Sequence, residues 1–243
     1  MALRSFVDGA VFAEVYGTDT PEVLALHGWG RRGSDFAVTL DGLSALAPDL
    51  PGFGASPAPN HVIGAEAYAD IVAGMLDVFD RPPVLLGHSF GGRIAVCLAA
   101  RHPERVGPLV ITGAPLIRLE TGRRPPPAYR MARWLHRAGF LSDERMERVK
   151  RSRGSPDYRA ATGVMRNILV KVVNESYEGQ LGRINTHVRL IWGEDDREVP
   201  VSVAEASVAL ISKASLDVLP GVGHMVPLEA PEALRAAVDK ARG

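Results

Sequence analysis

A serine between two glycines is the residue whose type and surroundings most clearly suggest chemistry. Residues 87–91 read GHSFG, with Ser89 at the centre. This spacing is typical of a nucleophile on a sharp turn between a strand and a helix, where crowding excludes larger side chains. The same pattern also arises by chance, so the segments before and after it decide whether it marks a nucleophile. An apolar run at 84–86 precedes it and helical spacing follows at 91–100. Ser89 is therefore predicted to be a nucleophile.

A serine nucleophile needs a base within hydrogen-bond reach, and four histidines follow it in the chain. In an open parallel sheet the functional groups gather beyond the carboxyl ends of the strands, so the base should directly follow a strand. His102 follows a predicted helix, His136 lies in a helical stretch, and His187 precedes a strand. His224 alone follows a predicted strand, in a glycine-rich loop. We therefore expect His224 to be the base.

An acid is needed to orient that base, because a carboxylate fixes the imidazole tautomer and stabilises the imidazolium. Glu194, Asp195 and Asp196 follow the predicted strand at 188–192. Asp196 lies farthest past the strand, where a turn can direct it at His224. The spacing alone does not exclude Asp195. We interpret the two remaining acids as a solvated turn.

The elements that must position these residues alternate along the chain. Short apolar runs that end in glycine-rich turns are predicted to be strands, at 10–16, 23–27, 47–50, 84–86, 109–112, 188–192 and 216–219. Stretches with helical spacing lie between them, at 35–46, 65–79, 91–100, 201–211 and 231–241. Such alternation predicts an α/β fold with a mainly parallel β-sheet flanked by helices. The central strands lack a polar face, as expected of strands buried on both sides.

One long stretch interrupts the alternation. After residue 114 only helices are predicted, at 128–138, 143–153 and 157–176, until the strand at 188–192. The sequence therefore predicts a core domain formed by residues 1–114 and 186–243. Residues 115–185 are predicted to form a helical cap, or lid, over one end of the sheet.

The predicted cap is basic and carries large apolar side chains. Residues 118–153 hold eleven Lys and Arg against four Asp and Glu, an excess of seven positive charges. This excess favours an anionic small-molecule substrate, although solvated helix faces would explain it equally well. The expected pocket-lining residues, which core packing could also explain, are Trp29, Met131, Trp134, Phe140 and Met165.

Composition excludes several classes of protein. Lys and Arg number 28, as do Asp and Glu, so the neutral chain is not expected to bind nucleic acid. Cys97 is the only cysteine, which excludes an internal disulfide and fits a cytoplasmic location. No apolar run is long enough for a membrane helix, and residues 1–13 do not resemble a signal peptide. The scattered His and acidic residues show no metal spacing, so neither metal nor cofactor is expected.

Taken together, these motifs resemble the α/β-hydrolase superfamily across nearly the whole chain. The resemblance includes the GHSFG turn and the order Ser89, Asp196, His224. It extends to HGWG at 27–30, DLPGFGAS at 49–56, WGEDD at 192–196, VP at 199–200 and GVGH at 221–224. In that family the aspartate of the G-x-x-D motif is the triad acid, which favours Asp196 over Asp195.

Acyl transfer also requires donors for the oxyanion. The Phe90 N–H, at the start of the predicted helix, is one expected donor, and a second should come from the loop after His27. The resemblance places that second donor at Trp29. The Trp29 side chain is expected to narrow the acyl pocket, unless it is a core residue. His27 and His88 are interpreted as structural histidines.

The sequence thus predicts a serine hydrolase that cleaves carboxylic esters or related acyl compounds through an acyl-enzyme. The main alternative is a C–C bond hydrolase or triad-dependent lyase acting on an anionic conjugated substrate. A cofactor-free perhydrolase and a non-catalytic binding module are further alternatives. The oligomeric state is left open.

Overall fold

An eight-stranded sheet forms the centre of the computed structural model, which describes residues 2–118, 127–153 and 155–243. The strand order is β1-β2-β4-β3-β5-β6-β7-β8. The strands are β1 (Ala2–Phe6), β2 (Val11–Tyr16), β3 (Val23–Leu26), β4 (Ala45–Asp49), β5 (Val84–His88), β6 (Leu109–Thr112), β7 (Val188–Gly193) and β8 (Ala214–Leu219). Only the β1–β2 and β2–β4 pairs are antiparallel. The predicted α/β fold with a mainly parallel sheet is confirmed.

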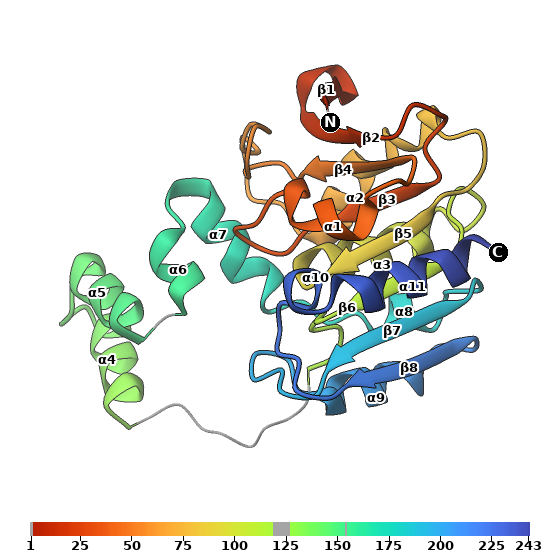
Figure 1. The fold of residues 1–243 in the computed structure, drawn as a ribbon. Helices are drawn as coiled ribbons and strands as arrows, with labels where there is room; N and C mark the ends of the chain where they lie inside the picture. Colours follow the sequence, from red (N-terminus) through yellow and green to blue (C-terminus); the bar gives the residue numbers. More distant parts are fainter. Residues whose placement is uncertain (1, 119–126, 154) are drawn as a thin grey trace.

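Helices cover both faces of this sheet (Figure 1). One face is covered by α2 (Ala65–Ala73), α3 (Phe90–Arg101), α8 (Glu178–Leu181) and α9 (Val201–Val208). The other face is covered by α1 (Ala37–Leu40) and α11 (Pro231–Arg242), with α10 (Val226–Glu229) packed against α11. Short 3-10 turns lie at η1 (Val7–Gly9), η2 (Gly33–Phe36) and η3 (Leu76–Val78).

The central strands are apolar on both faces because each face packs against its own core. Leu85 of β5 lies in the larger core with α2 and α3. Its neighbours Val84 and Leu86 lie in the smaller core with α11. Successive side chains of a strand point to opposite faces, so a strand between two helical layers has no polar positions. Cys97 of α3 is fully buried in the larger core, as expected.

Three predicted helices were too long. The helix predicted at 35–46 ends at Leu40, because Gly42 turns the chain with a φ of +71°, and β4 begins at Ala45. The helix predicted at 65–79 ends at Ala73 and continues only as the 3-10 turn η3. The helix predicted at 157–176 is two helices, α6 (Pro156–Ala160) and α7 (Gly163–Val172), separated by extended backbone at Thr162.

The edge strand β1 was not predicted at all. It pairs with β2 from Ala2 opposite Val15 to Phe6 opposite Val11. Four of its five residues are exposed, so its sequence shows no alternation of apolar and polar residues. Hydrogen bonding to β2 forms this strand, and no sequence pattern reports that pairing.

Helices alone lie between β6 and β7 in the described residues of that segment. They are α4 (Pro127–Arg137), α5 (Asp143–Arg153), α6, α7 and α8. Figure 1 shows α4 and α5 side by side and away from the sheet, whereas α7 reaches the core, where Ile168 and Val172 are buried. The part of this segment at 119–126, and residue 154, lie outside the described residues. No helix in the described ranges is long and apolar enough to span a membrane.

Candidate active site

Ser89 occupies the turn between β5 and α3. Its backbone has φ +50° and ψ −110°, a region that a residue with a side chain rarely occupies. The Ser89 N–H donates to Thr112 O at 2.8 Å, and its carbonyl accepts from the N–H groups of Gly92 and Arg93 at 3.1 and 3.4 Å. The strained turn is thus held by neighbouring backbone, a pattern that clusters at functional sites.

The two glycines of the GHSFG motif are required by close backbone contacts. A Cβ added at Gly91 would lie 1.9 Å from the carbonyl oxygen of Leu26 in β3. A Cβ added at Gly87 would lie 2.7 Å from the Cα of Gly92. Neither backbone neighbour can move without disturbing β3 or α3, so the turn admits only glycine at these positions. This is the crowding that the motif predicted.

His224 and Asp196 form a buried hydrogen-bonded pair. His224 Nδ1 lies 2.8 Å from Asp196 Oδ2, and the Asp196 side chain has no exposed surface. The other carboxylate oxygen, Oδ1, accepts the N–H groups of Glu198 and Val199 at 2.9 and 2.8 Å. Burial acts to lower the pKa of His224. The hydrogen bond to Asp196 and the charges of Asp196, Glu198 and Glu229 outweigh that effect and raise it.

Ser89 and His224 lie on two sides of the residues that follow β6. The Ser89 N–H bonds to Thr112, and the next residue, Gly113, faces the imidazole: an added Cβ there would lie 3.0 Å from His224 Cε1. Within the described chain, Ser89 Oγ makes no hydrogen bond. His224 Nε2 instead has the Glu198 carboxylate 3.6 Å away. Catalytic hydrogen bonds are often long or unformed without substrate, so this spacing is compatible with a triad.

The competing acids and histidines lie elsewhere. Glu194 and Asp195 are exposed, and the Asp195 N–H bonds to Val222 O. His102 is near Asp70 at the end of α3, His136 contacts Asp143 in the segment between β6 and β7, and His187 lies before β7. The structure therefore brings Asp196, and not Asp195, to His224. In the described residues no three potential metal ligands converge.

His27 holds the loop that carries Trp29. Its Nδ1–H donates to Gly28 O at 2.7 Å, and its Nε2 accepts the Leu50 N–H at 2.9 Å. Both bonds are satisfied only by the neutral ring, and burial lowers the pKa of His27 to about 4. His27 thus has the structural role that was expected.

His88 has a similar role beside His224. Its Nε2–H donates to the backbone oxygen of His224 at 3.0 Å, and the two rings lie 5.0 Å apart. Burial, with a smaller effect from His224, lowers the pKa of His88 to about 3. A neutral His88 can fix the backbone of His224 but cannot compete with it as a base.

The backbone N–H groups of Trp29 and Phe90, the two predicted oxyanion donors, are held in fixed directions by the hydrogen bonds of their peptide carbonyls. Gly28 O accepts from the His27 ring and from the Arg31 N–H, so the Trp29 N–H of the same peptide plane points the opposite way. Ser89 O is held by two N–H groups of α3, which fixes the Phe90 N–H in the same manner. Among the described residues neither the Trp29 nor the Phe90 N–H has a protein acceptor. The two predicted donors are therefore free and fixed in direction.

Aromatic side chains form a cluster beside these donors. The Trp29 ring packs edge-on against Phe53 and Phe90, at centroid distances of 4.9 and 5.3 Å. Trp29 is half-buried, so it both packs on the core and presents a surface. Phe53 was missed in the sequence, although it lies in the DLPGFGAS motif. This cluster can form the wall of an apolar acyl pocket.

The other predicted pocket residues divide into two groups. Met165 of α7 lies against the turn at Gly52, where an added Cβ would be 2.3 Å from its sulfur atom. Met131, Trp134 and Phe140 are 61%, 62% and 76% exposed on α4 and the turn after it, and the structure does not bring them to Ser89. The periodicity of apolar residues predicts that a helix has an apolar face, but it does not identify the surface against which that face packs.

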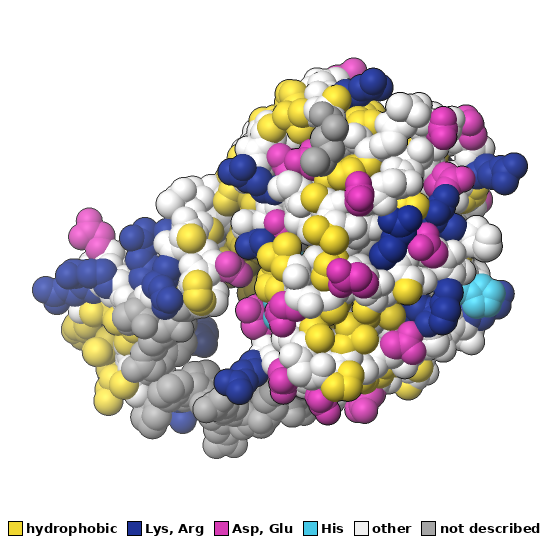
Figure 2. All heavy atoms as spheres, in the orientation of Figure 1, with side chains coloured by type: hydrophobic (Ala, Val, Ile, Leu, Met, Phe, Trp, Pro, Cys, Tyr) yellow, Lys and Arg dark blue, Asp and Glu magenta, His cyan; other side chains and the backbone are white. Residues whose placement is uncertain are grey.

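Carboxylates, and not the predicted basic groups, lie beside His224. Asp157 of α6 lies near Gly30, and burial, together with the charge of Glu198, raises the pKa of Asp157. Many Lys and Arg side chains gather over α4 and α5, which lie away from the sheet, and others are spread over the core (Figure 1, Figure 2). The Lys and Arg side chains that were expected to attract an anionic substrate are therefore not the groups that lie beside His224. Neither Glu198 nor Asp157 was identified from the sequence.

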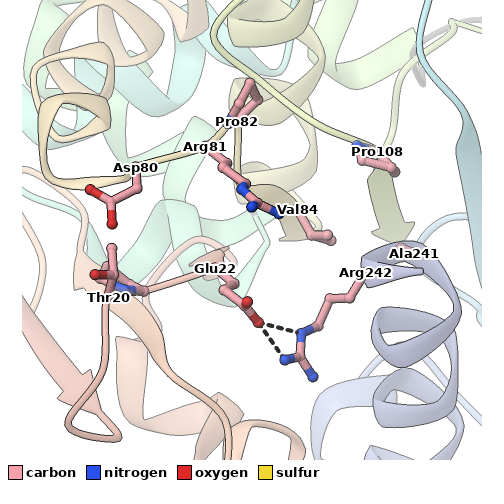
Figure 3. A pocket seen from close by; sticks show the side chains of 10 residues that line it. Thr20, Glu22, Asp80, Arg81, Pro82, Val84, Pro108, Ala241 and Arg242 are labelled. Atoms are coloured by element: carbon pink, nitrogen blue, oxygen red, sulfur yellow. Dashed lines mark hydrogen bonds and ion pairs between the residues drawn. The ribbon is translucent and has the colours of Figure 1, made fainter.

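A cavity of about 270 Å³ lies at the opposite edge of the sheet, by the amino ends of β3 and β5 (Figure 3). It is crossed by an ion pair in which Arg242 Nε donates to Glu22 at 2.9 Å. Its remaining lining residues are Thr20, Pro21, Asp80, Arg81, Pro82, Val84, Pro108 and Ala241. Its lining contains no histidine that could activate the Thr20 hydroxyl, so it does not repeat the arrangement at Ser89.

Comparison with known proteins agrees with this fold. Residues 23–237 match the family model described as the alpha/beta hydrolase family. The chain is 28% identical over 256 aligned residues to a 2-hydroxy-6-oxononadienedioate/2-hydroxy-6-oxononatrienedioate hydrolase of Cupriavidus pinatubonensis, covering 91% of this chain and 86% of that protein.

Esterases are also among the similar proteins. A pimeloyl-[acyl-carrier protein] methyl ester esterase of Chromobacterium violaceum is 41% identical over 117 residues, covering 46% of this chain and 44% of that protein. The crystal structure of an esterase from Rhodococcus sp. ECU1013 matches with a TM-score of 0.71 and 25% identity, covering 100% of this chain and 98% of that one. The similar proteins thus include both ester and C–C hydrolases.

Proposed function

This chain belongs to the alpha/beta hydrolase family, and we propose that it hydrolyses carboxylic esters with Ser89 as nucleophile, His224 as base and Asp196 as the residue that orients the base. One observation carries the proposal. The strained turn at Ser89 bonds to Thr112, and the adjacent Gly113 faces the ring of His224, whose Nδ1 is held by a buried carboxylate. A serine is activated by such a base, and a base needs such an orienting group.

The first half of the reaction forms an acyl-enzyme. Ser89 Oγ attacks the ester carbonyl carbon while His224 Nε2 takes the hydroxyl proton. The negative charge on the carbonyl oxygen is stabilised by the N–H groups of Trp29 and Phe90, each contributing about 3 kcal/mol in sites of this kind. The tetrahedral intermediate collapses, the C–O bond to the alcohol breaks, and the leaving alkoxide takes the proton from His224.

The second half returns the enzyme to its starting state. Water attacks the acyl carbon and His224 Nε2 takes its proton. The same oxyanion donors act again, the bond to Ser89 Oγ breaks, and the proton passes from His224 back to the serine. Asp196 stabilises the imidazolium in both halves without taking a proton. The products are a carboxylic acid and an alcohol.

Substrate charge near the base is the next part of the proposal. Glu198 lies 3.6 Å from His224 Nε2, and burial together with the charge of Glu198 raises the pKa of the nearby Asp157. The negative charges beside His224 repel a negatively charged substrate, so a neutral ester should bind at this point better than a dianion. We assign residues 115–185 the role of a cap over the apolar wall of Trp29 and Phe53, with Met165 of this cap lying against the neighbouring turn at Gly52.

A C–C bond hydrolase is the second candidate function. The observation in its favour is the similarity to a dienedioate hydrolase along 91% of this chain. The same three residues would serve it, with a conjugated oxo acid as substrate and a carbanion as leaving group. Carboxylates beside His224 favour the ester.

Two substrate panels separate these candidates. The first is a p-nitrophenyl ester series from acetate to octanoate, and the second is a 2-hydroxy-6-oxo-dienoate whose absorbance falls on cleavage. The proposal predicts ester turnover that falls by about three to six orders of magnitude in Ser89→Ala, as in triad deletions elsewhere. The exposed Ser34→Ala change is the matched control and should leave turnover unchanged. Turnover of the dienoate alone would assign the second function.

A further inference from the structure

Glu229, at the end of α10, hydrogen-bonds to the backbone on both sides of His224. Its Oε2 accepts the Gly223 N–H at 2.7 Å, and its Oε1 accepts the Met225 N–H at 3.0 Å. One carboxylate thus spans the residue that carries the imidazole. Hydrogen bonds to an ionised acceptor are about twice as strong as those between neutral groups.

Backbone hydrogen bonds hold the two ends of the loop that carries His224: the Asp195 N–H donates to Val222 O at 2.9 Å, and the Leu228 and Glu229 N–H groups donate to Met225 O at 2.8 Å. Residues 222–225 belong to no strand or helix, so no regular ladder fixes them. The only other side chain that bonds to this backbone among the described residues is His88, whose Nε2–H donates to His224 O. The imidazole itself packs against Gly113. Glu229 therefore holds the N–H groups of Gly223 and Met225, and His88 holds the carbonyl group of His224. Together they fix the backbone that carries the ring.

We propose that Glu229 is a positioning residue that holds His224 at the angle needed to bond Asp196 and to reach Ser89. The proposal rests on the proposed function only for the identity of the base. It requires no contact between Glu229 and substrate. A misplacement of a catalytic group by about 1 Å can cost about 10²-fold in rate, so a backbone clamp of this kind is measurable.

The charge of Glu229 also acts on His224, together with the other groups that face the ring. These are Asp196 and Glu198 after β7, His88 at the end of β5, Asp157 of α6, and Glu229 itself. Glu229 is one of the charges that raise the pKa of His224. Loss of the Glu229 charge should therefore lower that pKa while loosening the loop.

The test uses the full chain with Glu229→Ala, Glu229→Gln and the control Glu232→Gln, an exposed acid at the start of α11. We expect kcat to fall by about 10²-fold in the alanine variant and by about tenfold in the glutamine variant, which keeps one acceptor. KM should stay within about twofold, because no substrate contact is removed. The acid limb of the rate profile should move to lower pH in both. The control should match wild type.

An NMR titration of the His224 ring, assigned by its loss in His224→Gln, supplies a readout that does not depend on turnover. The proposal expects a weaker Nδ1–H signal and a lower pKa in both Glu229 variants. If wild type turns over no ester but the ring responds in this way, the proposed function fails and the positioning role stands. If wild type is active while kcat, the acid limb and the ring signal of Glu229→Ala equal those of wild type, the positioning role is wrong.

Discussion

Asp196 uses both carboxylate oxygens to hold a single geometry, with Oδ2 2.8 Å from His224 Nδ1 and Oδ1 bonded to two backbone N–H groups. Because the backbone bonds fix the carboxylate, the histidine has only one direction in which to point its Nδ1–H. The neutral ring then presents Nε2 as an acceptor. In the proposed mechanism this nitrogen takes the proton of Ser89.

Replacement of Asp196 tests that arrangement. Asp196→Asn keeps the shape but can present an amide N–H to His224, which favours the wrong tautomer. We expect kcat to fall by about 10³ to 10⁴-fold. Asp195→Asn is the matched control, since Asp195 is exposed and does not contact the ring, and it should leave kcat unchanged. Steady-state kinetics on an ester check both variants. Equal losses of kcat in the two variants would contradict the assignment of Asp196 as the acid that orients His224.

Glu198 should set the acid limit of activity. His224 accepts a proton only when Nε2 is free, so the rate falls as the pH drops through the raised pKa of His224. Glu198→Gln removes a negative charge 3.6 Å from Nε2, which lowers that pKa and extends activity to lower pH. The pH profile of kcat/KM measures this shift, with Glu194→Gln as the control. An acid limb that stays in place, or that moves to higher pH, would contradict the assignment.

Gly91 should tolerate no side chain. An added Cβ would lie 1.9 Å from the Leu26 carbonyl oxygen, so β3 or α3 must shift. We expect Gly91→Ala to lower the free energy of unfolding by about 3 kcal/mol or more, the upper range for overpacking. Gly179→Ala in α8 meets no atom within 4 Å and serves as the control, with little change or a small gain. Chemical denaturation measures both. A stable Gly91→Ala protein would mean that the turn is less crowded than described.

Trp29 should restrict the length of the acyl chain. Its ring packs on Phe53 and Phe90, while its backbone N–H is the proposed oxyanion donor. Trp29→Ala keeps the donor and opens space, so the ratio of octanoate to acetate kcat/KM should rise by about tenfold, a typical value for pocket changes. Trp134→Ala, at a tryptophan that is 62% exposed, should leave the ratio unchanged. The opposite ranking of the two variants would place the pocket under α4.

Much of this site could be predicted because it depends on local pattern. Ser89, Asp196 and His224 each follow an apolar run, and strands that are buried on both faces are plain in a sequence. Crowding at Gly87 is likewise local, because its nearest atoms belong to Gly91 and Gly92, whereas Gly91 is crowded by the Leu26 carbonyl oxygen of the distant strand β3. The fold class followed from the alternation of strands and helices, which the sheet order confirms.

The remainder depends on contacts between distant segments, which a sequence pattern does not report. β1 exists because its backbone pairs with β2. The roles of Glu198 and Glu229 depend on where their carboxylates lie relative to the imidazole of His224. The exposure of Met131 and Trp134 was unpredictable because an amphipathic face requires a cover but does not name one. The helix end at Leu40 was missed because Gly42 takes a left-handed conformation, and the end at Ala160 because the backbone at Ala161 and Thr162 is extended.

The most direct test of the account is covalent labelling of the full chain by a fluorophosphonate, followed by mass spectrometry of the intact protein and its peptides. The account predicts one phosphonyl group per chain, located on Ser89, with labelling lost in Ser89→Ala and strongly slowed in His224→Gln. A wild-type protein that takes up no label, or a Ser89→Ala protein that is labelled at the wild-type rate, would contradict the claim that Ser89 is an activated nucleophile.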